Sequence, residues 1–403
     1  MKKESYSLKQ ILTSNGNWYR FYEDNSPRIR ESILVAITKL LSCRTTVRGY
    51  HQYRCENSAC PHVKRVAHTC KSKACSSCGK KATEVWIKQQ NGILPQTQWQ
   101  HITFTMPSQL WDFFWTNREL LNLIGKIAAH AVLSFAKTKG VIPAIFIAIH
   151  TFSHDLERNV HIHLSTTRGG ITFDFTQWKR LFFNQATLMK IWRYEIIQLF
   201  RKHYQKKQLV IPPAIQKNIN HTNTFNSFLN QLYKKHWLVH CSKASEDYQY
   251  ILNYLGRYVK RPAIAQSKLR HYDGNTVTFD YLDRTHKKNT RLQLSVNDFI
   301  GRFIQHIPDA HFRMIRYYGV LSHRLRGELL PKVYQLLGQQ KPPDDNTPKN
   351  SEFATLMEKD FGVNPLICIL CGGKLLLEFV FYGKSSVSEL LQIHRQLALT
   401  KKI

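Results

Sequence analysis

Two histidines separated by one residue, His161 and His163 in the segment NVHIHLSTT, have the residue type and spacing of metal ligands. Side chains two residues apart on a β-strand point to the same face, so both imidazoles could bind one divalent ion while Ile162 enters the core. A catalytic metal site also needs a third protein ligand and open positions for substrate. The alternative is a pair of histidines with a purely structural role in the strand.

Two tyrosines in the segment YLGRY, Tyr254 and Tyr258, lie four residues apart, which places them one turn apart on the same face of a helix. A tyrosine with its ordinary pKa of about 10 is a weak nucleophile at neutral pH. A metal that polarises a phosphodiester makes attack by the phenolate feasible, and the product would be a 5′-phosphotyrosine link with a free 3′-hydroxyl. Tyr248 and Tyr250 lie close by, so spacing alone does not decide which pair acts.

A cysteine-rich segment from residue 55 to residue 78 predicts a structural zinc site. Two spaced cysteine pairs can supply the four thiolates of a tetrahedral shell, and Gly79 allows a tight turn behind the second pair. The expected ligands are Cys55, Cys60, Cys75 and Cys78. Cys70 is the substitute ligand. Lysines and arginines surround these cysteines, so we expect the zinc-binding module to contact DNA phosphates as well.

A second pair, Cys368 and Cys371 followed by two glycines, resembles half of a zinc knuckle. Its partner ligands are not visible in the sequence. The favoured interpretation is a pair of cysteines that binds no metal. The alternative is a zinc ion shared with residues elsewhere in the chain or with another chain.

The charge of the chain indicates a polyanionic partner. Lys and Arg number 58 against 27 Asp and Glu, a formal net charge of +31, and nucleic acid is the leading candidate. The basic clusters recur along the chain, so the folded body itself is basic. The N-terminus has no apolar stretch typical of a signal peptide and the longest apolar run, 141–149, is too short to span a bilayer, so we expect a cytoplasmic protein without a membrane partner.

The elements that must position these residues alternate between helices and strands. Segments 101–106, 145–152 and 160–167 have residue patterns typical of β-strands. The sequence RGG at 168–170 predicts a turn after the third of these strands. A helix should begin near residues 245–247 and end before Pro262, and segments 276–283 and 290–296 should form a hairpin. These expectations describe an α+β sheet domain.

Five segments together resemble the transposases of the insertion sequence 91 family: CRTTVRGYHQYRC, HTCKSKACSSCGKKATEVW, HTFSHDLERNVHIHLSTTRGG, YLGRYVKRPAIAQSKLRHYDGNTVTFDYLDR and FRMIRYYGVLSHR. The resemblance runs in one consistent order from about residue 8 to residue 325. These enzymes are two-tyrosine HUH endonucleases with an N-terminal zinc-binding domain. The resemblance implies a mainly antiparallel HUH palm with flanking helices and with the metal-binding histidines on a central strand, preceded by a small zinc-ribbon-like domain.

Carried over residue by residue, the resemblance makes His161 and His163 ligands of a catalytic Mg²⁺ or Mn²⁺ and makes Tyr254 and Tyr258 the nucleophiles. The substrates it implies are single-stranded DNA at the transposon ends and at the target, joined in a rolling-circle-like route. The residues expected to clamp DNA phosphates beside the nucleophiles are Arg257, Lys260 and Arg261. The third metal ligand is left open among Glu246, Asp247, Gln249, His150 and His154.

The expected domains are residues 1–95 for the N-terminal helix and zinc module, 96–336 for the catalytic domain, and 337–403 for a linker and a small segment with Cys-x2-Cys. The alternatives are a plasmid-type replication initiator or relaxase, and a non-catalytic, zinc-dependent DNA-binding protein derived from a transposase. The expected location is the bacterial cytoplasm, on the nucleoid when the protein is bound to DNA.

Overall fold

A computed structural model describes residues 6–219, 221–235, 237–245, 247–259, 262–283, 288–340, 358, 364–384 and 386–400 of the chain. It forms two compact units. One consists of Met1–Ala82, Arg261–Asp309 and Pro343–Ile403, and the other of Thr83–Lys260 and Ala310–Pro342. This division differs from the three consecutive segments expected, because residues distant in the sequence pack together. In the first unit, for example, the Asn17 side chain donates a hydrogen bond to the hydroxyl of Tyr272 over 2.8 Å.

The second unit is built on a six-stranded sheet. Its antiparallel path runs β11-β4-β5-β3-β7, and β6 pairs with β5. The strands are β3 (Trp99–Phe104), β4 (Val141–Phe152), β5 (Arg158–Thr172), β6 (Trp178–Arg180), β7 (Val239–Cys241) and β11 (Ile315–Gly319). The histidine strand β5 is the central strand of the path, as expected.

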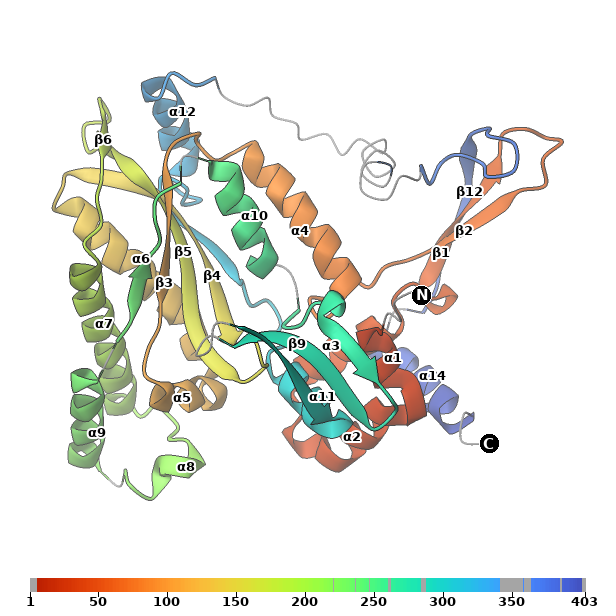
Figure 1. The fold of residues 1–403 in the computed structure, drawn as a ribbon, viewed down its shortest axis with the longest axis horizontal. Coiled ribbons are helices and arrows are strands. Elements are labelled where there is room, and N and C mark those ends of the chain that lie inside the picture. The colour runs from red at the N-terminus through yellow and green to blue at the C-terminus, as the bar shows by residue number, and fades with distance from the viewer. Residues whose placement is uncertain are drawn as a thin grey trace. The chain divides into compact units, whose positions relative to one another are not determined.

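Helices cover both faces of this sheet (Figure 1). On one face α6 (Leu121–Lys137) and α7 (Gln185–Gln205) bury the odd-numbered isoleucines of β4 in the larger core. On the other face α10 (Tyr248–Val259) and the end of α4 (Ser76–Asn91) pack on Ala144, Phe146 and Ala148. The alternation of β4 therefore sends its side chains into two separate cores. Shorter helices complete the unit: α5 (Trp111–Thr116), α8 (Pro213–Gln216), α9 (Thr222–Lys234) and α12 (Arg326–Leu336).

The RGG segment does not form the expected turn, because β5 continues through it to Thr172. Its glycines instead permit close packing. A Cβ atom on Gly169 would lie 2.5 Å from the indole nitrogen of Trp178, and one on Gly170 would lie 2.8 Å from the backbone of Ile142. The absence of side chains at these two positions lets β6 and β4 approach the central strand.

One helical stretch of the described chain, Arg118–Lys137, is long and apolar enough to cross a membrane by length and composition alone. Its most apolar window has a mean hydropathy of 1.3 and is 56% buried inside the protein. Residues of α6 such as Ile124, Ala128 and Val132 are fully buried in the core beneath the sheet. This helix therefore has the position of a core helix.

The first unit contains two three-stranded sheets and several helices. The predicted hairpin is confirmed by β9 and β10, which pair antiparallel with Thr276 opposite Ser295. Its elements are α1 (Leu8–Thr13), α2 (Asn17–Asn25), α3 (Glu31–Leu41), α11 (Val296–Gln305), α14 (Val387–Thr400), β8 (Leu269–Tyr272), β9 (Thr276–Asp283), β10 (Lys288–Ser295), β1 (Gly49–Cys55), β2 (Val63–Ala67) and β12 (Leu375–Tyr382). The sheet orders are β10-β9-β8 and β12-β1-β2. The expected α+β class is confirmed in both units.

Candidate active site

The register of the central strands gathers three histidines on one face of the sheet. His163 of β5 lies opposite Ala148 of β4, and His161 lies opposite His150. Because paired residues of antiparallel strands point to the same face, the three imidazoles share that face. One ring nitrogen of each lies within 4.8 Å of the others, and all three side chains are at most 6% exposed.

The contacts of the cluster bring one ring nitrogen of His161 against one of His163. The Nδ1 atom of His161 lies 2.9 Å from the carbonyl oxygen of Asn159, which can only accept, so this nitrogen carries the proton and Nε2 holds a lone pair. Nε2 of His161 is 3.1 Å from Nε2 of His163. A proton on Nε2 of His163 would make this contact a hydrogen bond, whereas a proton on Nδ1 of His163 leaves two lone pairs that a cation can bridge. This donor set therefore fits a bound metal ion.

His101 of β3 orients one of the cluster histidines. Its Nε2 lies 3.0 Å from Nδ1 of His163, and burial, together with the charges of His240 and His150, lowers the pKa of His101 to about 4. A neutral His101 can accept the Nδ1 proton of His163, and in that tautomer Nε2 of His163 carries the lone pair that a metal ligand needs. The sequence analysis missed this residue. The available signal was its position on strand 101–106, although only the register of β3 on β5 shows which histidine it faces.

The sequence left five candidates for the third metal ligand. Of these, the structure places His150 beside His161 and His163. Glu246 lies outside the described residues. Asp247 has a different partner, since its Oδ1 accepts the backbone N–H of Gln249 over 2.8 Å at the start of α10. That contact is typical of an acidic residue at a helix N-terminus.

The tyrosine helix α10 packs on the same face of the sheet that carries the histidines. Ile251 and Leu252, both buried, lie in one core with Phe146 and Ala148 of β4. A Cβ atom on Gly256 would lie 2.7 Å from the side chain of Ile87 in α4, so this glycine marks the closest approach of the two helices. The tyrosine positions lie on the other side of α10 from Gly256, by the 100° per residue of a helix.

The residues expected to act on DNA are described only in part. For Tyr254, Arg257 and Tyr258 the structure describes the helical backbone and not the side chains, and Lys260 and Arg261 lie outside the described residues. The two further tyrosines of β11 are poor candidates for a nucleophile. Burial raises the pKa values of Tyr317 and Tyr318, and Trp86 donates a hydrogen bond to the Tyr317 hydroxyl.

The cysteines form two clusters of four, and this corrects the expected grouping. Cys75 and Cys78 lie with Cys70 and Cys43, whereas Cys55 and Cys60 do not join them. The second cluster consists of Cys55, Cys60, Cys368 and Cys371. Cys70 is thus a full member of the first cluster rather than a substitute. The expected set was split because β1 carries Cys55 away from the helix start that holds Cys75 and Cys78.

Comparison with known proteins agrees with the sequence resemblance. A family described as "Transposase zinc-binding domain" of the insertion sequence 91 type matches residues 14–106, and one described as "Putative transposase" matches residues 144–328. The chain is 38% identical over 377 residues to "Transposase for insertion sequence element IS801" of Pseudomonas savastanoi pv. phaseolicola, covering 93% of this chain and 90% of the relative. The chain belongs to the insertion sequence 91 family of transposases.

A second relative of the chain is "Putative transposase y4qJ" of Sinorhizobium fredii (strain NBRC 101917 / NGR234). The two chains are 25% identical over 393 residues, which cover 95% of this chain and 97% of the relative. No solved structure matches the chain. The family assignment supports an enzyme that acts on DNA and carries zinc in its N-terminal domain. The first cysteine cluster, Cys43, Cys70, Cys75 and Cys78, lies entirely within the zinc-binding match.

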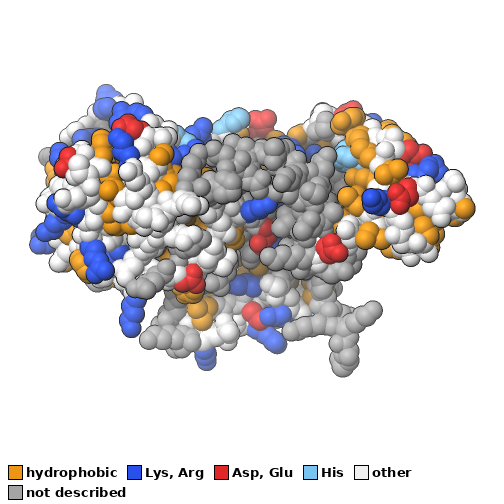
Figure 2. Space-filling model, turned by 90° about the horizontal axis from the view of Figure 1, so that it is seen from above, with side chains coloured by type: hydrophobic (Ala, Val, Ile, Leu, Met, Phe, Trp, Pro, Cys, Tyr) orange, Lys and Arg blue, Asp and Glu red, His pale blue; other side chains and the backbone are white. Residues whose placement is uncertain are grey.

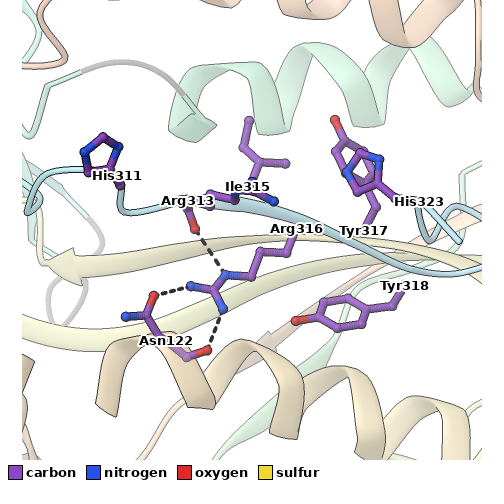
Figure 3. A pocket seen from close by; sticks show the side chains of 8 residues that line it. All are labelled: Asn122, His311, Arg313, Ile315, Arg316, Tyr317, Tyr318 and His323. Carbon is purple, nitrogen blue, oxygen red and sulfur yellow. Dashed lines mark hydrogen bonds between the residues drawn. The ribbon is translucent and has the colours of Figure 1, made fainter. Parts of the chain in front are cut away.

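An open cavity of about 440 Å³ at the β11 edge of this transposase has the composition of a nucleic-acid contact. It is lined by residues that include Asn122, His311, Arg313, Tyr317, Tyr318 and His323. Figure 3 shows Tyr317 and Tyr318 on opposite sides of the strand, with Arg316 hydrogen-bonded to Asn122. His311, Arg313 and His323 are exposed, and Ile315 and Tyr317 share the face of the sheet that carries the histidine cluster.

Basic side chains are spread over the surface of the described residues rather than confined to one patch. Figure 2 shows Lys and Arg side chains over several parts of one face, with Asp and Glu side chains between them. Some arginines are tied to acids, as Arg158 is to Asp112 over 2.6 Å and Arg270 is to Asp280 over 2.5 Å. With 58 basic residues against 27 acids, most positive charges remain available to a polyanion.

Proposed function

We propose that this transposase cuts and rejoins single-stranded DNA at the ends of its element, with Tyr254 and Tyr258 as nucleophiles. The observation that carries the proposal is the position of helix α10 on the sheet face that holds His150, His161 and His163. A nucleophile-bearing helix and a metal-binding cluster on one face are what tyrosine attack on a phosphodiester requires.

His150, His161 and His163 would hold a Mg²⁺ or Mn²⁺ ion, which when bound supplies positive charge that polarises the scissile phosphodiester. His101 keeps His163 in the tautomer that can bind the ion, and the carbonyl of Asn159 does the same for His161. These contacts orient the rings before the DNA binds.

The phenolic oxygen of one tyrosine forms a bond to phosphorus, and the bond from phosphorus to the 3′-oxygen breaks. The phenolic proton passes to solvent, and the released 3′-oxygen takes up a proton. The 5′-phosphotyrosine link retains the energy of the broken bond, so a 3′-hydroxyl can later attack it and restore the tyrosine. A second tyrosine one helical turn away would allow two strands to be held in succession.

The same sheet offers a surface for the DNA strand. The cavity at β11 presents His311, Arg313 and His323 beside Tyr317, and cations with aromatic rings suit the backbone and bases of an unpaired strand. Arg257, Lys260 and Arg261 are proposed to bind phosphates beside the nucleophiles, since they flank the tyrosines in sequence.

Cleavage of labelled oligonucleotides tests the proposal. Single strands from the ends of the element should be cut in the presence of Mn²⁺, leaving one fragment with a 3′-hydroxyl that a polymerase can extend. The same sequences as duplexes should resist. The variant with both His161→Ala and His163→Ala should lose cleavage, while His130→Ala, which changes an exposed histidine on α6, should retain it. Undiminished cleavage by the double variant would refute the metal-assisted mechanism.

A further inference from the structure

The C-terminal segment supplies half of a second four-cysteine cluster. β12 pairs antiparallel with β1, with Leu375 opposite Cys55 and Tyr382 opposite Gly49. This pairing brings the Cys368–Cys371 loop beside Cys55 and Cys60, more than three hundred residues away in sequence. We propose that these four thiolates bind a second structural zinc ion, which fastens the C-terminal segment to the N-terminal sheet.

The sulfur positions match a zinc site and not a pair of disulfides. The Sγ atoms of Cys55 and Cys371 are 3.4 Å apart, and those of Cys60 and Cys368 are 3.7 Å apart. Sulfurs bound to one zinc at about 2.3 Å in tetrahedral geometry are about 3.8 Å apart, whereas disulfide sulfurs are about 2.05 Å apart. The first cluster, inside the zinc-binding match, has the same spacing, with 3.7 Å between Cys43 and Cys78.

The backbone of the C-terminal loop has the form of a metal-binding knuckle. The N–H of Cys368 donates to the carbonyl of Gly373 over 2.7 Å, and the N–H of Gly372 donates back to the carbonyl of Cys368 over 2.9 Å. Gly372 adopts a φ of +73°, a conformation that favours glycine. A Cβ on Gly373 would lie 3.4 Å from Sγ of Cys371 and 3.5 Å from Sγ of Cys55, so this glycine packs directly against two of the sulfurs.

A histidine supports the thiolates from outside the shell. Nδ1 of His62 lies 3.0 Å from Sγ of Cys368. A ring N–H that donates to a zinc-bound thiolate is the kind of contact that orients a ligand and spreads its charge. This contact gives His62 a role in the site without making it a ligand.

Hydrophobic burial is too small to hold this sheet together. Its core contains three buried residues, Cys55, Cys368 and Leu375. Along β12, Leu376, Leu377 and Tyr382 are each more than half exposed. Cross-strand polar contacts help, since Arg54 and Gln52 both donate to Glu378, but exposed pairs stabilise little. A metal ion is the usual device by which such a small unit is stabilised.

Half of this site lies outside the matched segments, because Cys368 and Cys371 follow residue 328, whereas Cys55 and Cys60 lie within the zinc-binding match. The inference does not rest on the proposed cleavage chemistry. Its consequence is structural: the zinc-binding region of the chain is discontinuous and closes only when residues 364–384 are present.

Zinc content of the purified full-length protein tests the inference. We expect two zinc ions per chain for the unmodified protein, and one for the variant with Cys368→Ser and Cys371→Ser. The variant with Cys75→Ser and Cys78→Ser should also retain one. Cys241→Ser, which changes the cysteine outside both clusters, should retain two. One zinc in the unmodified protein, or two in the Cys368 and Cys371 variant, would overturn the inference.

Thiol alkylation of the unmodified protein gives a second readout that does not depend on a variant folding. Cys371 is exposed, so as a free thiol it should react at once with N-ethylmaleimide. As a zinc ligand it should be protected and should become reactive together with Cys55, Cys60 and Cys368 when a chelator is added. Rapid modification of Cys371 before chelation, measured by peptide mass spectrometry, would equally refute the site.

Discussion

At the scale of single residues, the ligand types set the metal preference of the candidate active site. Imidazole nitrogen is a softer ligand than carboxylate oxygen, and Mg²⁺ binds poorly to nitrogen. The cluster of His150, His161 and His163 should therefore prefer Mn²⁺. The proposed role of His101 follows from the same chemistry, because it fixes the proton of His163 on the nitrogen away from the ion.

Metal titration by calorimetry checks these residues. We expect Mn²⁺ to bind at least about tenfold more tightly than Mg²⁺. The substitution His163→Ala should abolish binding, and His101→Ala should weaken it by about 10–100-fold because the orienting contact is lost. His130→Ala should change nothing. Equal affinity of the His101→Ala variant and the unmodified protein would show that His101 only fills space.

The sequence predicted the histidine pair and left the third ligand open, for a physical reason. The spacing of His161 and His163 along one strand is local, so their common face follows from strand geometry. The approach of His150 depends on which residue of β4 lies opposite His161, and register across strands cannot be read from spacing. The cysteine grouping failed in the same way, since Cys43 and Cys368 reach their partners through long-range packing.

At the scale of elements, the contact between α10 and α4 holds the tyrosine helix in place. Gly256 permits this contact, because a side chain there would overlap Ile87 and approach Thr83, whose methyl group lies 3.3 Å from the position of a Cβ atom. Overpacking at such a point forces the helices apart. The glycine between the tyrosines is therefore required by packing and not only by its position in a motif.

The substitution Gly256→Val should lower the free energy of unfolding by about 1–3 kcal/mol. Adding Ile87→Ala should restore part of that loss by making room for the valine, while Asn253→Val on the exposed side of α10 should cost less than Gly256→Val. Chemical denaturation measures the unmodified protein, the three single variants Gly256→Val, Ile87→Ala and Asn253→Val, and the double variant. Additive effects of Gly256→Val and Ile87→Ala would contradict a direct contact between the two positions.

The strands that carry the histidines and the hairpin of β9 and β10 were predictable, and one wrongly assigned segment is instructive. The apolar run of β4 is typical of a strand buried on both faces, and the hairpin of β9 and β10 follows from its alternation of apolar residues. The RGG segment was assigned to a turn because glycine pairs commonly occur in turns. In β5 the same glycines serve close packing against Trp178 and Ile142, and no local pattern distinguishes these two uses.

At the scale of the whole molecule, the net charge of +31 determines how the protein should respond to salt. Binding of single-stranded DNA should weaken steeply as salt rises, because the release of cations from the phosphates is less favourable at a higher salt concentration. The slope reports the number of phosphates neutralised. The salt dependence of DNA binding follows directly from the composition. The two compact units consist of segments that are not consecutive in sequence, and they could not be predicted because they depend on long-range strand pairings such as that of Tyr50 with Phe381.

Fluorescence anisotropy across a salt series tests the role of the β11 cavity. If Arg313 contacts a phosphate, Arg313→Ala should reduce the slope of log affinity against log salt by about 0.7. Lys190→Ala, which removes a cation from α7 on the opposite face of the sheet, should change the slope less. An unchanged slope for Arg313→Ala would place the DNA strand elsewhere.

The proposed mechanism requires a tyrosine of α10 to become covalently joined to DNA. The direct measurement incubates the protein with single-stranded oligonucleotides from the ends of the element and Mn²⁺, isolates any adduct that survives denaturation, and locates the modified residue by mass spectrometry. We expect an adduct on Tyr254 or Tyr258 that is absent from the variant with Tyr254→Phe and Tyr258→Phe. An adduct that persists in that variant, or one attached to Tyr250, would contradict it.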